Sequence, residues 1–160
     1  METRLNNPVE ENKKEGQQGM EALSVMEEML KQLEVKKVDA KTYSPLALAY
    51  MGDAVYEIII RTMIVSRANQ QVNKYHKKAS SYVKAESQAK MIIKLEPYLT
   101  EEEEAVYKRG RNAKSYTSAK NASIIDYRMA TGFEALVGYL YLKNDWKRLM
   151  ELLHIGLFEQ

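Results

Sequence analysis

Residues 46–57 read LALAYMGDAVYE, an apolar run that a single Gly-Asp pair interrupts. Ser44 is a favourable helix N-cap and Pro45 a favourable first helical residue, so we expect a helix over residues 44–66. Apolar residues cover most of its circumference, which predicts a central position in the fold. Asp53 therefore places a carboxylate in a helix with an otherwise buried pattern, and an unpaired buried charge is costly.

The length and composition fit one globular domain. The chain has 160 residues and no cysteine, which suits a single hydrophobic core and excludes disulfides and thiolate metal sites. The N-terminal residues are polar and lack the apolar segment of a secretory signal, and no apolar stretch reaches the roughly 18 residues of a membrane span. We therefore expect a cytoplasmic protein.

The rest of the sequence indicates further helices. Thr100 and Glu103 form a capping box, and Gly110 has the position of a helix stop. Strict alternation of apolar and polar residues is absent, so the predicted fold class is all-α. Apolar spacing and cap signals predict helices over residues 20–33, 75–95, 100–109, 123–142 and 146–158, the last capped by Asn144 or Asp145.

The chain divides into three predicted parts. Residues 1–19 are polar with almost no apolar side chains, which predicts a disordered tail. Residues 20–43 form an N-terminal extension, consisting of a helix and a linker. Residues 44–160 form the core domain, which carries the chemistry described below.

A second carboxylate lies in a similar apolar setting. Glu134 belongs to MATGFEALVGYLYL, residues 129–142, and glycines accompany both acids. Glycine within a helix costs about 1 kcal/mol relative to alanine, so its presence indicates close packing or close approach of a ligand. Two long apolar helices that each carry one inward acid would bring Asp53 and Glu134 together. A divalent cation is then a suitable partner, and oxygen-only ligands favour Mg²⁺, with Mn²⁺ as a substitute.

The spacing of these acids is also compatible with two purely structural roles. Each carboxylate could be solvated at a helix surface, or paired with Arg61 or Arg128 from elsewhere in the chain. Glu57 lies four residues after Asp53 on the same helical face. We expect Glu57 to be exposed or paired rather than part of a metal site.

Two segments are strongly basic. Residues 108–120, KRGRNAKSYTSAK, hold five positive charges and no acid, and residues 74–84 contribute four lysines. Neutralisation of phosphates by such residues is typical of nucleic-acid binding, although a run of charges is often only a solvated helix face. Together with two buried acids, they indicate metal-assisted phosphodiester hydrolysis.

These residues resemble a known family. YMGDAVYE, residues 50–57, and FEALVGYLYL, residues 133–142, resemble the two catalytic helices of ribonuclease III domains. The similarity is greatest to Mini-ribonuclease III, which has the catalytic domain without a double-stranded RNA-binding domain. Four of its motifs occur here in order over residues 44–158: LALAYMGDAVYE, HKKASSYVKAESQAK, EEEEAVYKRGRNAKS and YRMATGFEALVGYLYL.

The resemblance implies a function for the core domain. The fold would be the ribonuclease III endonuclease-domain helical bundle, assembled as a homodimer. The protein would be a Mg²⁺-dependent endoribonuclease that cleaves double-stranded RNA, namely precursor 23S ribosomal RNA, with ribosomal protein L3 as a helper. Asp53 and Glu134 would be the catalytic and metal-binding residues. The RNA backbone would contact Lys77, Lys78, Arg109, Arg111, Asn112 and Lys114.

The sequence departs from ribonuclease III proper at three positions. Ala49 and Thr131 stand where that family has further acids, so the site is reduced to two carboxylates, and Tyr116 replaces an expected glycine. A non-catalytic RNA-binding or ribosome-assembly factor that retained the fold is the alternative function. Retention of both Asp53 and Glu134 argues against it, because a binding module has no reason to bear their desolvation cost.

Overall fold

The computed structural model describes residues 23–114 and 123–160. Within these ranges every regular element is a helix and no strand occurs, which confirms the all-α prediction. None of the described helices is both long and apolar enough to cross a membrane. The predicted tail over residues 1–19, and Tyr116, lie outside the described residues.

The chain divides into two compact units between Lys36 and Lys37. The first unit contains α1 (Val25–Gln32), the helix predicted in the N-terminal extension. Its start is fixed by a capping box, in which the Ser24 hydroxyl accepts from the backbone N–H of Glu27 at 3.2 Å. In return, the Glu27 carboxylate accepts from the backbone N–H of Ser24 at 3.0 Å.

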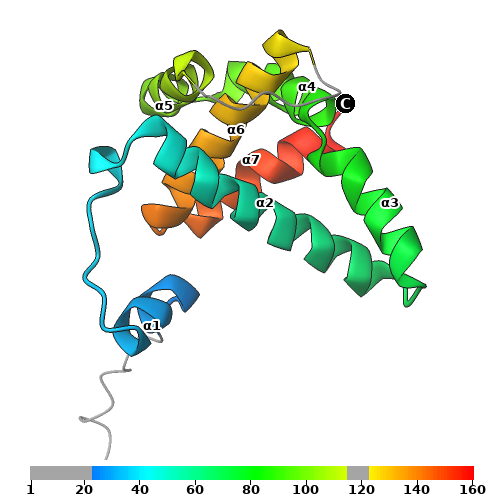
Figure 1. Ribbon diagram of the computed structural model, residues 1–160, viewed down its shortest axis with the longest axis horizontal. Helices are drawn as coiled ribbons and strands as arrows, with labels where there is room; N and C mark the ends of the chain where they lie inside the picture. Colours follow the sequence, from blue (N-terminus) through cyan, green and yellow to red (C-terminus); the bar gives the residue numbers. More distant parts are fainter. Residues whose placement is uncertain (1–22, 115–122) are drawn as a thin grey trace, which may run out of the picture. The chain divides into compact units, whose positions relative to one another are not determined.

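The second unit carries the remaining described helices (Figure 1). Two of its elements are single 3₁₀ turns and the others are α-helices. In chain order they are η1 (Ala40–Thr42), α2 (Pro45–Arg67), α3 (Val72–Val83), α4 (Ala85–Leu95), η2 (Glu96–Tyr98), α5 (Glu101–Asn112), α6 (Ile124–Leu142) and α7 (Trp146–Phe158).

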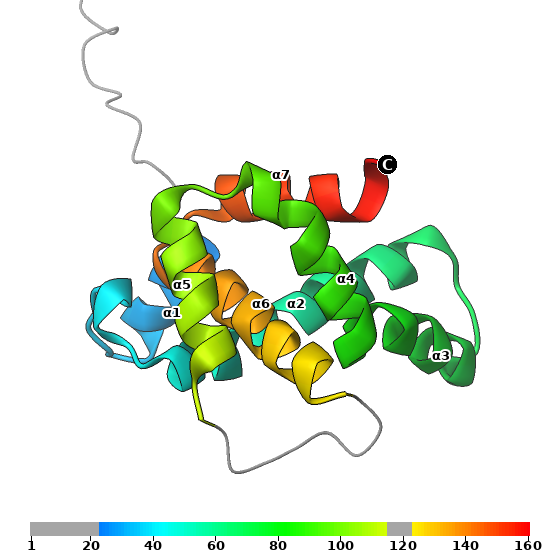
Figure 2. The ribbon, with the colours of Figure 1, turned by 90° about the horizontal axis from the view of Figure 1, so that it is seen from above.

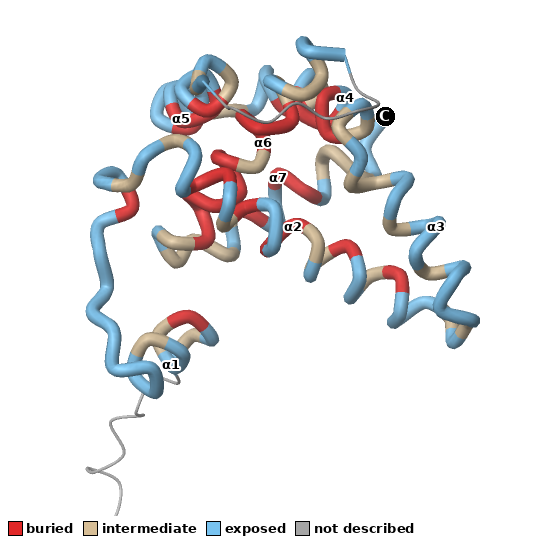
Figure 3. The backbone as a smooth tube through the Cα atoms, viewed as in Figure 1, coloured by how far each residue is buried: buried red, intermediate tan, exposed pale blue. Residues whose placement is uncertain are grey.

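The centre of this unit is α6. Helices α2, α4, α5 and α7 all pack against it, and Figure 3 shows its buried course through the unit. Every residue from Ala130 to Tyr141 is buried, with the sole exception of Glu134. The ring of Phe133 meets that of Tyr56 on α2 edge-on, with centroids 5.0 Å apart. The core is therefore assembled around the helix that carries one of the two predicted catalytic acids.

Helix α2 begins as predicted but is less central than its composition indicates. The Ser44 hydroxyl accepts from the backbone N–H of Ala47 at 3.2 Å, and Pro45 occupies the first turn. One face, which includes Ile60, is buried. Tyr50, outside this face, is 84% exposed. The apolar residues of α2 therefore divide between the core and the solvent-exposed surface.

The prediction of one helix over residues 75–95 is wrong, because the helix is interrupted at Lys84, which separates α3 from α4. Lys84 has extended backbone angles, φ −64° and ψ 150°. Side chains from α4 bond back across the break: the Gln88 amide donates to the Val83 carbonyl at 3.0 Å, and the Ser87 hydroxyl donates to the Ser81 carbonyl at 2.6 Å. No glycine or proline marks this break, so composition alone gave no signal of it.

Gly110 does not end its helix, contrary to the prediction from the sequence. Helix α5 continues to Asn112, and Gly110 is buried against α6. A Cβ atom at Gly110 would lie 2.7 Å from the Cβ of Ala135 and 2.9 Å from the Cα of Gly132. The glycine is needed for close approach of two helices rather than for a change in backbone direction.

The predicted capping box of α5 is confirmed and extends into a tertiary contact. The Thr100 hydroxyl accepts from the backbone N–H of Glu103 at 3.2 Å. The buried Glu103 carboxylate also accepts from the Arg148 guanidinium of α7 at 2.7 and 3.0 Å. A third Arg148 bond, 2.7 Å long, reaches the carbonyl of Tyr98. One arginine thus joins α7 to the start of α5 through charge-assisted hydrogen bonds.

Candidate active site

Two glycines allow α2 and α6 to cross in backbone contact. A Cβ atom at Gly52 would overlap the carbonyl oxygen of Glu134 and lie 2.8 Å from the backbone nitrogen of Gly138. Reciprocally, a Cβ atom at Gly138 would overlap the carbonyl oxygen of Leu48 and lie 2.9 Å from the backbone nitrogen of Gly52. The Gly-Asp pair therefore has a packing role, because Gly52 sets the distance at which Asp53 meets α6.

This crossing brings the two predicted catalytic acids together. Asp53 follows Gly52 on α2 and is exposed, whereas Glu134 is the partly exposed exception on the buried stretch of α6. Their carboxyl groups interact electrostatically, since the charge of Asp53 raises the pKa of Glu134. The expectation from the sequence that the two acids lie close to each other agrees with this geometry.

Both carboxyl groups are harder to ionise than an ordinary side chain. Burial, followed by the charge of Asp53, raises the pKa of Glu134 to about 7, and a hydrogen bond from Gln88 opposes this increase. Asp53 is exposed as a whole, but partial desolvation of its carboxyl group, followed by the charge of Glu57, raises its pKa. Each effect disfavours the charged form, so the pair as it stands lacks a compensating positive charge.

No cation from the described part of the chain supplies that charge. Neither Asp53 nor Glu134 forms an ion pair with a described residue. Arg61, the nearest arginine along α2, instead binds Glu57 through a hydrogen bond of 3.0 Å from Nε. This pairing confirms the expected role of Glu57 and removes Arg61 as the partner of the site.

The donor set fits a divalent cation bound by few protein ligands. Two carboxylates offer only oxygen atoms, which suits Mg²⁺ or Mn²⁺, and Mg²⁺ commonly retains several waters. Residues 23–114 and 123–160 contain no cluster of three or more His, Cys, Asp or Glu that could hold a metal. A bound cation would favour the charged form of both acids and so offset the burial and the neighbouring negative charge that raise the pKa of each.

The positions where ribonuclease III proper has further acids are buried here. Ala49 is 5% exposed and Thr131 is 8% exposed. The Thr131 hydroxyl donates to the Tyr127 carbonyl one turn earlier, at 3.0 Å. Both side chains therefore belong to the packing of α2 and α6, and neither offers a carboxylate ligand.

The structure adds Gln88 to the site, a residue that the sequence patterns did not single out. Gln88 lies on α4, is 1% exposed, and lowers the pKa of the Glu134 carboxyl group. It shares helical spacing with the buried residues Met91, Ile92 and Leu95. A glutamine at an apolar-face position was the available signal, because buried amides are uncommon without a partner.

The predicted RNA-contacting residues form two groups rather than one. Lys77 and Lys78 are exposed on α3, whereas Arg109, Arg111, Asn112 and Lys114 lie at the end of α5. Figures 1 and 2 show α3 and α5 on opposite sides of α6. Within the second group, Arg111 is half-buried, with its guanidinium carbon 5.5 Å from the centre of the Tyr107 ring.

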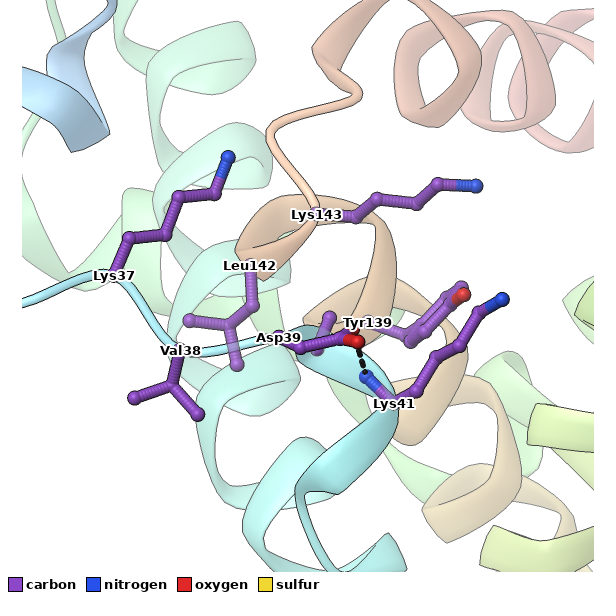
Figure 4. Close-up of a pocket in the computed structure, with 8 residues that line it drawn as sticks. Lys37, Val38, Asp39, Lys41, Tyr139, Leu142 and Lys143 are labelled. Atoms are coloured by element: carbon purple, nitrogen blue, oxygen red, sulfur yellow. Dashed lines mark hydrogen bonds between the residues drawn. The ribbon is translucent and has the colours of Figure 1, made fainter.

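A separate pocket of about 350 Å³ lies between η1 and the end of α6 (Figure 4). Lys37, Lys41 and Lys143 line it together with Tyr139. The Asp39 carboxylate, also in its wall, accepts from the backbone N–H of Lys41 at 3.0 Å. Neither predicted catalytic acid lines this pocket, so it is distinct from the α2–α6 crossing.

Comparison with known proteins identifies the family. Residues 46–145, which include both acids, match the ribonuclease III domain. The chain belongs to this family. Membership makes it an endoribonuclease, and ribonuclease III proteins generally use divalent metal ions and act on double-stranded RNA.

The chain is similar to individual proteins of the Mini-ribonuclease 3 subgroup. A protein named Mini-ribonuclease 3 from Clostridium tetani is 57% identical over 130 residues, covering 79% of this chain and 86% of that protein. The Mini-ribonuclease 3 of Enterococcus faecalis is 52% identical over 118 residues, covering 72% and 89% respectively. The resemblance to Mini-ribonuclease III seen in the sequence motifs is thereby confirmed.

A solved structure supports the arrangement of the helices. The crystal structure of a protein from Fusobacterium nucleatum superimposes with a TM-score of 0.66 at 28% sequence identity. The match covers 73% of this chain and 93% of that one. The helical core described above is thus a known architecture.

Proposed function

We propose that this endoribonuclease is Mg²⁺-dependent, cleaves double-stranded RNA and matures precursor 23S ribosomal RNA. The observation that carries the proposal is the pair of carboxylates, Asp53 and Glu134, placed together at a glycine-mediated helix crossing without a described counter-charge. In a ribonuclease III domain, such a pair supplies what a catalytic cation requires. Mn²⁺ would substitute for Mg²⁺, because its oxygen preference is similar.

Asp53 and Glu134 act as the metal-binding and catalytic residues in this proposal. Asp53 and Glu134 would hold the divalent cation, whose chemistry would be activation of water and stabilisation of negative charge on the leaving oxygen. Glu134 offers a carboxylate fixed in the α6 core, and Asp53 offers one at the solvent-exposed side of α2. Backbone contact at Gly52 keeps the two acids in register, since any shift of α2 along α6 would separate them.

RNA would be held by the two basic groups that flank α6. A-form RNA offers protein side chains mainly phosphates and 2′-hydroxyls, so charged and amide groups are suitable contacts. We assign this role to Lys77, Lys78, Arg109, Arg111, Asn112 and Lys114. Replacing Arg111 and Lys114 by alanine should weaken RNA binding and flatten its dependence on salt. An unchanged salt slope in a filter-binding titration would remove these residues from the interface.

A homodimer is supported by the exposed face of α2. Leu46, Tyr50 and Ile58 follow one another at multiples of four residues and are 39%, 84% and 61% exposed. A stripe of exposed apolar side chains marks an interaction site. A two-fold axis would set this stripe against the same stripe of a second copy, with Asp53 beside the interface on the same helix.

The remaining parts of the proposal rest on the family resemblance alone. We assign a tail to residues 1–19, an extension to residues 20–43 and the catalytic domain to residues 44–160. The Mini-ribonuclease III family has the catalytic domain without a double-stranded RNA-binding domain, so weak RNA affinity would make assistance by ribosomal protein L3 useful. Ribosomal RNA as substrate agrees with the predicted cytoplasmic location.

A cleavage assay tests the proposed activity. Purified protein is incubated with a labelled RNA duplex, or with its single strands, in Mg²⁺ or in chelator, and products are resolved on a denaturing gel. We expect cleavage of the duplex in Mg²⁺ only. Cleavage in chelator would contradict metal dependence, and equal cleavage of single strands would contradict the substrate.

The alternative function is that of a non-catalytic RNA-binding or ribosome-assembly factor. One observation favours it: Ala49 and Thr131 leave the site with two acids, and the described residues hold no larger acidic cluster. The same assay separates the two functions. A protein that shifts the duplex on a native gel but leaves it intact in both Mg²⁺ and Mn²⁺ would support the alternative.

A further inference from the structure

The pocket between η1 and the end of α6 gathers positive charge from two separate segments of the chain. Lys37 and Lys41 belong to the segment that contains η1, and Lys143 is the residue that ends α6. Figure 4 shows the side chains of Lys41 and Lys143 extending in the same direction as that of Tyr139, with Lys37 at the opposite side of the pocket. Ammonium groups therefore lie at both sides of one cavity.

The carboxylates at the pocket do not match this positive charge. Asp39 lies in the wall and accepts from the backbone N–H of Lys41. Glu102 on α5 is shared, because its oxygens lie 3.7 Å from Nζ of Lys41 and 3.6 Å from Nζ of Lys143, and it also accepts from the Tyr139 hydroxyl. Both distances exceed the roughly 2.7–2.9 Å of a charge-assisted hydrogen bond. Two carboxylates thus face three ammonium groups.

Lys37 is the lysine of this pocket with most of its binding capacity left. It forms no ion pair with a residue in the described ranges. A lysine ammonium group has three N–H donors and no acceptor. The pocket therefore has both net positive charge and free donors for an anionic ligand.

The size and lining of the pocket fit a small ligand. Its volume is about 350 Å³, and small-molecule sites typically measure about 300–1,000 Å³ and combine apolar walls with a few charged groups. Val38 and Leu142 provide apolar wall, and Ala40 and Tyr139 are buried beneath it. Lysine is a common ligand of phosphate.

The number of charges favours a terminal phosphate over one within a nucleic-acid backbone. A phosphate monoester carries about −1.5 to −2 charges at neutral pH and presents three acceptor oxygens. A backbone phosphodiester carries a single charge and must continue out of the pocket in two directions. Three lysines around one cavity suit the monoester better.

We propose that this pocket binds a terminal phosphate monoester, with Lys37, Lys41 and Lys143 donating to its oxygens. A free nucleotide and the 5′-phosphate end of an RNA strand both offer this group. The site contains neither Asp53 nor Glu134 and needs no metal, so it is separate from the proposed catalytic function.

The test is isothermal titration calorimetry in chelator, with adenosine 5′-monophosphate as the probe and adenosine as its unphosphorylated counterpart. We expect the wild type to bind the monophosphate and not adenosine. Lys37→Met and Lys143→Met each remove one ammonium group from an exposed side chain. Each variant should keep wild-type helix content and bind the monophosphate about tenfold more weakly.

Lys90 provides the matched control. It is an exposed lysine on α4 whose Nζ lies 3.0 Å from the carboxylate of Glu86, and it does not line the pocket. Lys90→Met should leave the affinity for the monophosphate unchanged. A loss equal to that in the pocket variants would show general attraction to a basic surface and would overturn the proposal.

A second titration distinguishes the sources of the phosphate, using a short single-stranded RNA with either a 5′-phosphate or a 5′-hydroxyl. A gain in affinity from the 5′-phosphate, present in the wild type and absent in Lys37→Met, would identify the RNA end as a ligand. Binding of the monophosphate without such a gain would identify a free nucleotide. The proposal is overturned if neither phosphorylated probe binds in a way that depends on Lys37 and Lys143. Because no step requires cleavage, an inactive wild type would overturn the proposed activity and leave this test intact.

Discussion

At the residue scale, the carboxyl group of Glu134 governs the behaviour of the site. Burial and the nearby charge of Asp53 raise its pKa from about 4.5 to about 7. Without a cation, the folded protein thus retains a proton that the unfolded chain has already lost in this range. Stability then falls as the pH rises from about 4.5 to about 7, because the folded state binds more protons than the unfolded state.

This linkage predicts a difference between wild type and Glu134→Gln in chelator. The free energy of unfolding of wild type, relative to the variant, should fall by about 3 kcal/mol over that range, since one pKa unit corresponds to about 1.4 kcal/mol. Urea unfolding at a series of pH values measures it. Added Mn²⁺ at neutral pH should raise the free energy of unfolding of the wild type but not that of the variant. Parallel stability curves for the two proteins would contradict the environment assigned to Glu134.

Asp53 and Glu134 are the part of the candidate site that the sequence alone predicts. Each was an acid in an apolar helix beside a glycine, and the helix crossing brings the two together. Gln88 was missed because its burial near α6 depends on the interruption of the helix at Lys84 and on the packing of α4 against α6. The division of Lys77 and Arg111 between opposite sides of α6 was equally invisible, since it follows from how the helices pack.

At the element scale, the crossing of α2 and α6 positions the chemistry. Gly52 and Gly138 remove the side chains that would otherwise hold the helices apart. Glycine is an unfavourable residue inside a helix by about 1 kcal/mol. Contact between the two backbones must therefore offset this cost.

Substitution of Gly52 by alanine sets the gain in helix propensity against the steric cost of a new Cβ atom. Helix propensity alone would stabilise the protein, but the new Cβ atom overlaps the Glu134 carbonyl. We expect a net loss of about 2 kcal/mol or more in urea unfolding, since overpacking typically costs about 1–3 kcal/mol. Gly156→Ala is the control, because its Cβ meets only the flexible Met91 side chain. A stabilised Gly52→Ala protein would disprove the close crossing.

The helices themselves were predictable where local signals define them. Ser44 with Pro45 and Thr100 with Glu103 mark helix starts through their own side chains, and the structure confirms both. The break at Lys84 and the continuation through Gly110 were not predictable. They depend on side-chain bonds across the break in one case and on contact with α6 in the other.

At the scale of the whole molecule, the exposed face of α2 is the main feature that the single chain leaves unexplained. Tyr50 and Ile58 present apolar surface to solvent beside Asp53. The proposed homodimer would cover this stripe. The dimer would also set two active sites at a fixed separation along an RNA duplex.

Charge introduced on this stripe should produce monomers. We expect Ile58→Glu to shift the protein from a dimer to a monomer in analytical ultracentrifugation, while its helix content is retained, because like charges would face each other across a two-fold axis. Ile93→Glu, at an exposed position on α4, is the matched control. A monomeric wild type would contradict the proposed dimer, and a dimeric Ile58→Glu protein would place its interface elsewhere.

The central claim is that Asp53 and Glu134 form the metal-dependent catalytic pair, and Asp53→Asn tests it most directly. This change removes one charge and preserves the shape of an exposed side chain, so folding and assembly should be unaffected. The measurement is the rate of duplex RNA cleavage in Mg²⁺, with helix content and oligomeric state compared with wild type. We predict no detectable cleavage by a folded, normally assembled variant, whereas cleavage at the wild-type rate would contradict the claim.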